Sequence, residues 1–222
     1  MNYWTRLMTF RPEILQAITD TTIMMVLAML AALLIGLPVG TGLFLSRKNG
    51  VRPNRGFYWA LNIYVDTVRS FPFLLFVVAL IPLTRFVLGT AFGTYAAAFP
   101  LAFVAVAIYA RLVEQVLLDV PREVLELAAS LGATRWQLIW EFLYVEARSG
   151  LILSYTSTTI SLVSYSTVMG IVGGGGIGDF AIRYGYQRYE YDIMYTTILL
   201  MIVAVFLIQV LGTTTARLLD KR

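Results

Sequence analysis

Long uncharged stretches recur along the chain, separated by short segments that hold most of the charge. Neither acidic nor basic residues occur in 21–46, 86–110, 149–178 or 193–216. A helix crosses a hydrocarbon core of about 30 Å with roughly 20 apolar residues, so each stretch is long enough to span a membrane. Residues 70–84 are also uncharged, but they form only about 22 Å of helix and need residues 58–69 to complete a span.

The basic residues indicate how often the chain crosses. Residues 46–57 and 111–148 each contain four basic residues, which marks both segments as cytoplasmic. Two segments on one side require an even number of crossings between them, so 58–84 must cross despite Asp66 and Arg69. These two residues lie three apart on one helical face, where we expect them to neutralise each other in part. The predicted spans are 20–45, 58–84, 88–112, 149–172 and 193–217.

Five spans predict an amino terminus outside and a carboxyl terminus in the cytoplasm. This orientation places 12 of the 17 basic residues inside, which explains the net charge of +4 without a nucleic-acid partner. Composition agrees, because 59% of residues are apolar and 14% are charged, against about 25% charged in soluble domains. The sequence predicts an all-α, polytopic integral membrane protein, a single transmembrane domain over 1–222 whose solvent is largely membrane lipid.

The absence of cysteine and histidine removes the usual side chains for metal binding and for proton transfer at neutral pH. We therefore expect no catalytic, cofactor-binding or metal-binding residues in this chain. A glycine-rich run at 173–178 contains the spacing G-x-G-x-x-G, but no strand precedes it, so a dinucleotide site is not indicated. An outer loop that changes shape is the better interpretation of this run.

The largest hydrophilic segment predicts two short amphipathic helices over about 121–145. Pro121 suits the first turn of a helix, and Gly132 suits a left-handed carboxyl-terminal cap. Thr134 and Gln137 have the spacing of a capping box, which begins a second helix. The apolar positions of that helix repeat every three or four residues: Trp136, Ile139, Trp140, Leu143 and Tyr144. The pair lies at the lipid interface or docks on a partner, and the small residues Ala128 and Ala129 favour docking.

The predicted span 149–172 is rich in hydroxyl groups. Such groups either bond to their own helix or line a hydrated path. Tyr165 and Met169 lie four residues apart and therefore on one face, with Ser166 beside them. A gate for a sulfur-containing or apolar amino acid and ordinary core packing both explain this set.

The stretch Glu126-Leu-Ala-Ala-Ser-Leu-Gly132 resembles the E-A-A-x-x-x-G coupling loop of bacterial ATP-binding-cassette (ABC) importer permeases. The resemblance to the methionine-importer type extends over 20–218, through Arg69-Ser-Phe-Pro-Phe, Ser164-Tyr-Ser-Thr-Val-Met and Ile182-Arg-Tyr-Gly-Tyr-Gln. Leu127 stands where the family has its first alanine, and Val145 stands where it has a proline. Without that proline, the sequence does not define the residue at which the second helix ends.

The resemblance implies the type I ABC importer permease fold in a bacterial inner membrane, working as a homodimer. Two copies of a cytoplasmic ABC ATPase would bind ATP and Mg²⁺, and an extracytoplasmic binding lipoprotein would deliver the substrate. The residues that would couple to the ATPase are Glu126, Ala128, Ala129, Gly132 and Trp136. The residues that would line the substrate path or gate are Tyr165, Ser166 and Met169.

The implied function is import of methionine, as the L- or D-isomer, driven by the partner ATPase. The chain has no G-x-x-x-x-G-K-[ST] phosphate-binding loop and is therefore not expected to be an enzyme itself. Three alternatives stay open: an ABC permease for another amino acid or short peptide, a secondary transporter or channel subunit, and a structural membrane subunit. The lack of charge in the middle of four spans speaks against a proton relay.

Overall fold

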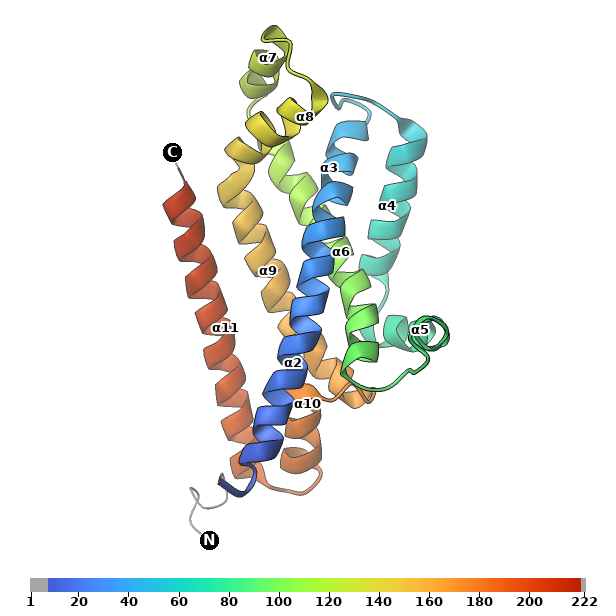
Figure 1. The fold of residues 1–222 in the computed structure, drawn as a ribbon, viewed down its shortest axis with the longest axis vertical. Coiled ribbons are helices and arrows are strands. Elements are labelled where there is room, and N and C mark those ends of the chain that lie inside the picture. Colours follow the sequence, from blue (N-terminus) through green and yellow to red (C-terminus); the bar gives the residue numbers. More distant parts are fainter. Residues whose placement is uncertain (1–7, 221–222) are drawn as a thin grey trace.

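The computed structural model describes residues 8–220, which form a bundle of helices along one axis (Figure 1). No residue within 8–220 forms a strand, and the all-α prediction is confirmed. The helices are α2 (Arg11–Ala31), α3 (Leu37–Ser46), α4 (Arg55–Ser70), α5 (Phe73–Leu88), α6 (Thr94–Leu118), α7 (Arg122–Ser130), α8 (Arg135–Gln137), α9 (Tyr144–Ile171), α10 (Gly176–Phe180) and α11 (Tyr191–Leu219).

Within residues 8–220, three π-helical turns continue α-helices without interrupting them, and two of them join consecutive helices. The turn Ala32–Gly36 joins α2 to α3, so that Arg11–Ser46 is one helix of 36 residues. Pro38 at the start of α3 has no backbone N–H to donate, and a local change of helical pitch accommodates it. The turn Leu138–Leu143 joins α8 to α9 in the same way. The third turn, Ala181–Tyr186, extends α10.

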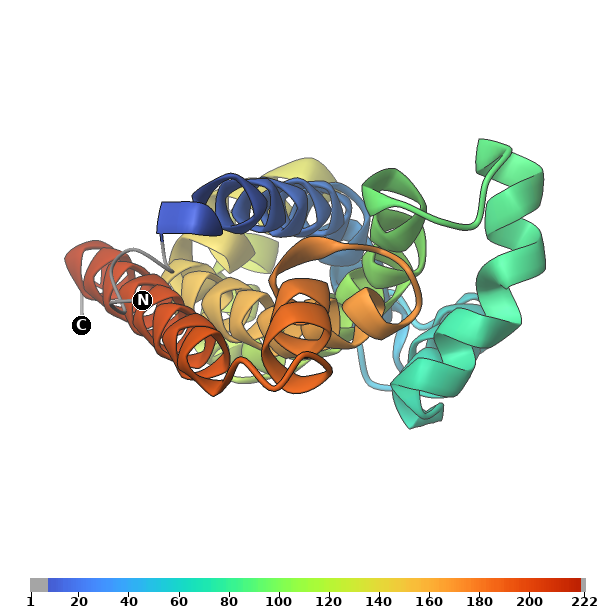
Figure 2. The ribbon, with the colours of Figure 1, turned by 90° about the horizontal axis from the view of Figure 1, so that it is seen from below.

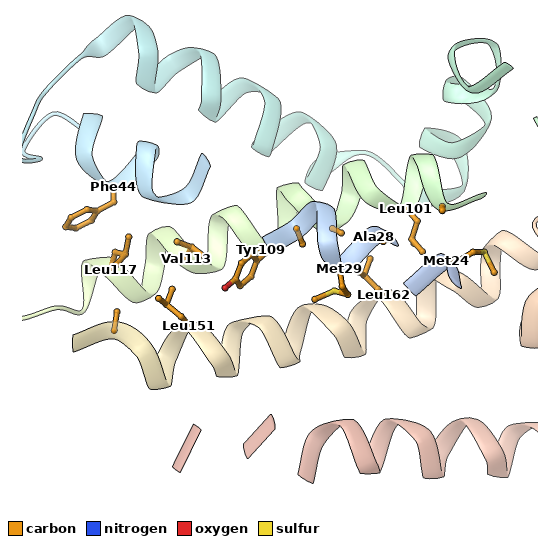
Figure 3. Packing of buried hydrophobic residues seen from close by; sticks show 14 of the residues in the cluster. Met24, Ala28, Met29, Phe44, Leu101, Tyr109, Val113, Leu117, Leu151 and Leu162 are labelled. Atoms are coloured by element: carbon orange, nitrogen blue, oxygen red, sulfur yellow. The ribbon is translucent and has the colours of Figure 1, made fainter. Parts of the chain in front are cut away.

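The core lies where α6 is surrounded by α2, α3 and α9. Side chains from these helices point toward one another in Figure 3, among them Met24, Leu101, Tyr109 and Leu162. Alanines along α6 let its neighbours approach closely, which is how helices associate in lipid. By contrast, α11 buries little of itself and exposes a row of large apolar side chains. That surface suits lipid or a second copy of the chain.

The second predicted span is not a straight helix. Among the residues that the structure describes, three helices are long and apolar enough to cross a membrane alone, and the number reaches five only if each of two bent pairs counts as one span. One bent pair is α4 and α5, which meet at 117°. Pro72 causes the break, because it lacks an N–H and holds Phe71 extended, with φ −80° and ψ 134°. Figure 2 shows α5 lying across the side of the bundle opposite α11.

The expected pairing of Asp66 with Arg69 is also wrong. Asp66 accepts hydrogen bonds from Arg111 on α6 and from Asn62 on its own helix, the latter at 2.6 Å. Arg111 donates in addition to Glu114, whose side chain is 6% exposed. This ionic cluster connects α4 to α6. An ion pair across two helices was not visible in the local spacing from which the prediction was made.

The polar connections gather at the two ends of the bundle. The basic segment 47–54, α7 and the end of α11 lie at one end, whereas the beginning of α2 and the connection between α10 and α11 lie at the other (Figure 1). Three of the 17 basic residues, Arg6, Lys221 and Arg222, lie outside the described residues. Of the remaining basic residues predicted to face the cytoplasm, Arg69 is an exception, because it lies in the last turn of α4, away from the basic segment 47–54.

Candidate functional site: the coupling end and the bend between α4 and α5

The turn after α7 has the left-handed glycine that the sequence predicts. Gly132 has φ +67°, and its N–H donates to the carbonyl of Ala129 at 3.1 Å. The next N–H, that of Ala133, donates to the carbonyl of Ala128 at 3.0 Å. These two bonds form a Schellman cap, which satisfies the last carbonyls of α7 and turns the chain. A Cβ at Gly132 would meet nothing within 4 Å, so the backbone conformation alone favours glycine here.

The capping box that begins the second helix is confirmed. The Thr134 N–H donates to Oε1 of Gln137 at 2.9 Å, and the Gln137 N–H donates to Oγ1 of Thr134 at 3.4 Å. However, this helix is not the short, separate element that the sequence predicts for about 121–145. It continues from Arg135 to Ile171 as one helix, with Val145 inside it. A proline would interrupt the backbone hydrogen bonds at that position, and valine does not.

The five predicted coupling residues divide into exposed and buried members. Glu126, Ala129 and Trp136 are exposed, and Trp136 retains 72% of its surface. Ala128 is only 2% exposed and packs inside the chain's own core, so in this structure it shapes α7 and does not face a partner. Gly132 shapes the turn.

Two further apolar residues at this end were not among the predicted coupling residues. Leu127 and Leu131 are exposed, Leu131 at 68%. They lie four apart on α7 and at its end, a spacing that puts both on one side. Together with the three exposed members they form what we call the coupling surface, which comprises Glu126, Leu127, Ala129, Leu131 and Trp136. Exposed apolar side chains on such a projection are typical of a surface that binds a protein partner or lies at the lipid interface.

The residues predicted for the substrate path occupy different environments. Tyr165 packs its ring against Phe73 of α5, with 4.5 Å between the ring centroids. Met169 is 3% exposed and lies beneath α5, near Val77 and Thr84. Ser166 is buried, and its hydroxyl donates to the carbonyl of Val163 on its own helix at 2.8 Å. The structure therefore brings Tyr165 and Met169 to α5 but turns Ser166 away.

Five other hydroxyls of α9 also bond to their own helix. Each of the following donates to the carbonyl four residues earlier: Thr156, Thr158, Thr159, Ser161 and Thr167. These bonds agree with the packing interpretation, and Thr167 in addition lines a cavity between α9 and α11.

A cavity of about 540 Å³ lies at the bend between α4 and α5. Arg69 and Ser70 line it from α4, Phe73 from α5, Val104 from α6 and Tyr165 from α9. It therefore joins four helices at the place where α4 ends. Sequence reading identified Tyr165 and the motif Arg69-Ser-Phe-Pro-Phe separately, and only the fold shows that they share one cavity.

The glycine run at the other end of α9 is a turn over residues 173–175, as the sequence predicts, and its last part, from Gly176, is already helical. Residues Gly176–Tyr186 are helical, and the Ile177 N–H donates to Oγ1 of Thr21 on α2 at 2.8 Å. A Cβ at Gly178 would come within 2.3 Å of the Thr167 carbonyl oxygen. The glycines here permit close packing of α10 on α9. A change of shape during transport stays a prediction.

These features define a class: a helical membrane protein with a bent span and a projecting surface that exposes apolar side chains. Residues 32–222 match the model of the family described as binding-protein-dependent transport system inner membrane component, and the chain belongs to that family. Its fold is that of a solved inward-facing structure of the MetNI methionine ABC transporter, with a TM-score of 0.92 and 34% identity, covering 96% of this chain and 99% of that one. This is the type I ABC importer permease fold.

Two curated relatives cover most of the chain. The probable D-methionine transport system permease protein MetI of Vibrio cholerae is 42% identical over 209 residues, which are 94% of this chain and 93% of the relative. The methionine import system permease protein MetP of Bacillus subtilis is 34% identical over 180 residues, 81% of each chain. The chain is thus the membrane component of a bacterial ABC transporter.

Proposed function

We propose that this protein carries methionine across the bacterial inner membrane into the cytoplasm, and that a separate ATPase subunit supplies the energy. The observation that carries the proposal is the match to the methionine ABC transporter over 96% of the chain. The names of the relatives support the same substrate, as D-methionine for MetI and as methionine for MetP. We include both stereoisomers in the proposal.

The coupling surface is the proposed contact with the ATPase. Trp136 and Leu131 provide exposed apolar area, while Glu126 provides a charge at its edge. Large aromatic side chains at the centre of an interface contribute most of its binding energy. Ala128 and Gly132 have an indirect role, because they hold α7 and its turn in shape. The proposed assembly has two copies of the chain and two ATPases, which bind ATP and Mg²⁺, with a binding lipoprotein on the outer side.

Coupling from this surface to the membrane has a direct mechanical route. Trp136 lies in the first turn of the helix that runs without a break to Ile171. A force on Trp136 therefore reaches Tyr165 and Met169 through one rigid element. We infer that closure of the ATPases moves this helix against α5, which contacts Tyr165 and lines a cavity with Met169, and so switches the path between inward-open and outward-open states.

The proposed orientation puts the coupling end in the cytoplasm and the amino terminus outside, as the distribution of basic residues favours. The chain has no cysteine, so single cysteines report sidedness cleanly. In spheroplasts, a membrane-impermeant maleimide should label Tyr186→Cys, whereas Val51→Cys should react only after permeabilisation. Both side chains are exposed in the structure. The reverse pattern would invert the orientation.

Uptake of labelled methionine tests the function. Cells that lack this permease should regain uptake when it is restored together with its ATPase and binding protein. A partner ATPase that binds but does not hydrolyse ATP should abolish the uptake. Uptake that persists with the inactive ATPase would favour a channel or secondary transporter. An assembled complex that hydrolyses ATP but imports another amino acid would keep the permease assignment and replace the substrate.

A further inference from the structure

Arg69 lies within the predicted span 58–84 and has no counter-ion among residues 8–220. It lies 14 residues after Arg55, roughly 21 Å along α4, which carries it deep into the membrane from the basic end. Arg69 is exposed and lines the cavity together with Val104, near the middle of α6. A charge at this depth is costly in free energy, so it indicates a site with a function.

The acidic residue closest along the helix is not available to neutralise it. Oδ1 of Asp66 accepts from Arg111, and Oδ2 of Asp66 accepts from Asn62. Among residues 8–220, no ion pair or hydrogen bond engages the Arg69 guanidinium. The same ionic cluster that holds α4 against α6 therefore leaves Arg69 free at the cavity.

The other walls of the cavity are apolar and aromatic. Phe73 and Tyr165 face each other with 4.5 Å between ring centroids, and Val104 and Ile108 complete the wall from α6. At about 540 Å³ the cavity is within the size range of small-molecule sites. The Arg69 guanidinium, which prefers carboxylates, therefore lies beside a surface that suits an apolar or thioether side chain.

We propose that this cavity is a binding site for the transported amino acid, in which Arg69 binds the α-carboxylate and the Phe73–Tyr165 pair holds the side chain. The inference rests on the proposed function and assigns its substrate class to particular atoms. The planar guanidinium matches a carboxylate with two parallel hydrogen bonds, which lysine does not reproduce. The site also lies on α9, the helix that connects the coupling surface to the membrane, so movement of α9 alters it directly.

The test uses photo-methionine, a diazirine analogue that retains the amino and carboxyl groups, on the permease purified with its ATPase. Irradiation should label peptides that contain Phe73 or Tyr165. Excess methionine should protect them, whereas methioninol, which lacks the carboxylate, should not. A charge-assisted hydrogen bond is lost in Arg69→Gln, so labelling should fall at least about tenfold. Arg69→Lys should retain an intermediate yield.

Arg85→Gln is the matched control, because Arg85 is an exposed arginine of α5 that does not line the cavity. It should label and import as the unaltered protein does. Co-purification with the ATPase checks that each variant assembles, and methioninol protection of the unaltered complex tests the site even if Arg69→Gln does not assemble.

Equal labelling in Arg69→Gln, equal protection by methioninol, or labelling confined to other peptides would overturn the inference. If the unaltered complex imports methionine in these cases, the proposed function still stands; if it does not, both fail.

Discussion

Glycines lie beyond both ends of the helix Arg135–Ile171, and Gly132 in the turn before it serves a different purpose from Gly178 in α10 after it. Before its beginning, Gly132 adopts φ +67° in open space, where a Cβ would touch nothing. Beyond its other end, Gly178 packs so tightly that a Cβ would come within 2.3 Å of the Thr167 carbonyl oxygen. The first glycine serves backbone conformation, and the second serves close approach of two helices. Residues around the outer turn therefore pack against the chain's own helices. Residues next to Gly132, such as Leu131, stay exposed and are available to a partner.

The largest expected effect is at the packed end. Gly178→Val must separate α10 from α9, because backbone at Thr167 has no freedom to move aside. Overpacking costs typically 1–3 kcal/mol, and we expect the upper end, about 3 kcal/mol. The yield of folded protein after detergent extraction should fall severely. Gly56→Ala is the control, since its Cβ would meet only Asn54 Oδ1 at 3.8 Å. A normal yield of Gly178→Val would show that the outer turn is looser than the structure indicates.

At the exposed end, Trp136→Ala should leave the fold intact but weaken docking. The side chain is 72% exposed and supports little of the chain's own packing. Loss of an aromatic anchor at an interface costs about 2 kcal/mol or more, or roughly thirtyfold in ATPase affinity. Titration of the purified ATPase onto the permease measures it. Trp59→Ala, equally aromatic and 59% exposed on α4, should not alter the affinity. If both variants bind alike, Trp136 is outside the interface.

Gly132 allows a graded experiment on the coupling turn. A left-handed conformation costs non-glycine residues about 1–2 kcal/mol, less for asparagine and more for β-branched residues. Methionine imported per ATP hydrolysed should therefore decrease in the order glycine, asparagine, alanine, valine. A steric limit would instead rank the variants by size, with asparagine worse than alanine. The open space around Gly132 favours the conformational order.

The smallest effect concerns the bond that ties the outer turn to α2. Thr21→Val removes the hydroxyl that accepts the Ile177 N–H and leaves that buried donor without a partner. The cost is about 1 kcal/mol, which lowers the thermal midpoint by roughly 2–4 °C. Thr22→Val is the matched control, because Thr22 is exposed and its hydroxyl bonds only to its own helix. A shift of similar size in both variants would remove the special role of Thr21.

The sequence predicted features that depend on neighbouring residues. The capping box at Thr134 and the glycine cap at Gly132 were correct because each involves hydrogen bonds within a few residues. The motif around Glu126 and the matching blocks predicted the family, which the family match confirms, while the coupling role of the segment stays a prediction. The continuous helix through Val145 could also have been predicted, because no residue between 136 and 149 interrupts a helix.

Other features required the fold. Ala128 and Ala129 are chemically identical neighbours, yet one is buried and the other exposed, because only one side of α7 meets the bundle. The partner of Asp66 is 45 residues away, and local spacing pointed to Arg69 instead. Met169 and Tyr165 share a helical face, but their surroundings differ. The Met169 thioether is buried, whereas the Tyr165 ring lines the cavity at the 117° bend between α4 and α5.

By itself, therefore, the amino-acid sequence determined the solvent of this protein, its helical class, its caps and its family. These properties follow from the transfer of apolar side chains into lipid and from backbone hydrogen bonds close in the chain. The tertiary structure alone decided which charges pair, which side of α7 remains free and where Arg69 meets an aromatic cavity. Such contacts depend on the relative placement of helices, which packing over the whole chain determines.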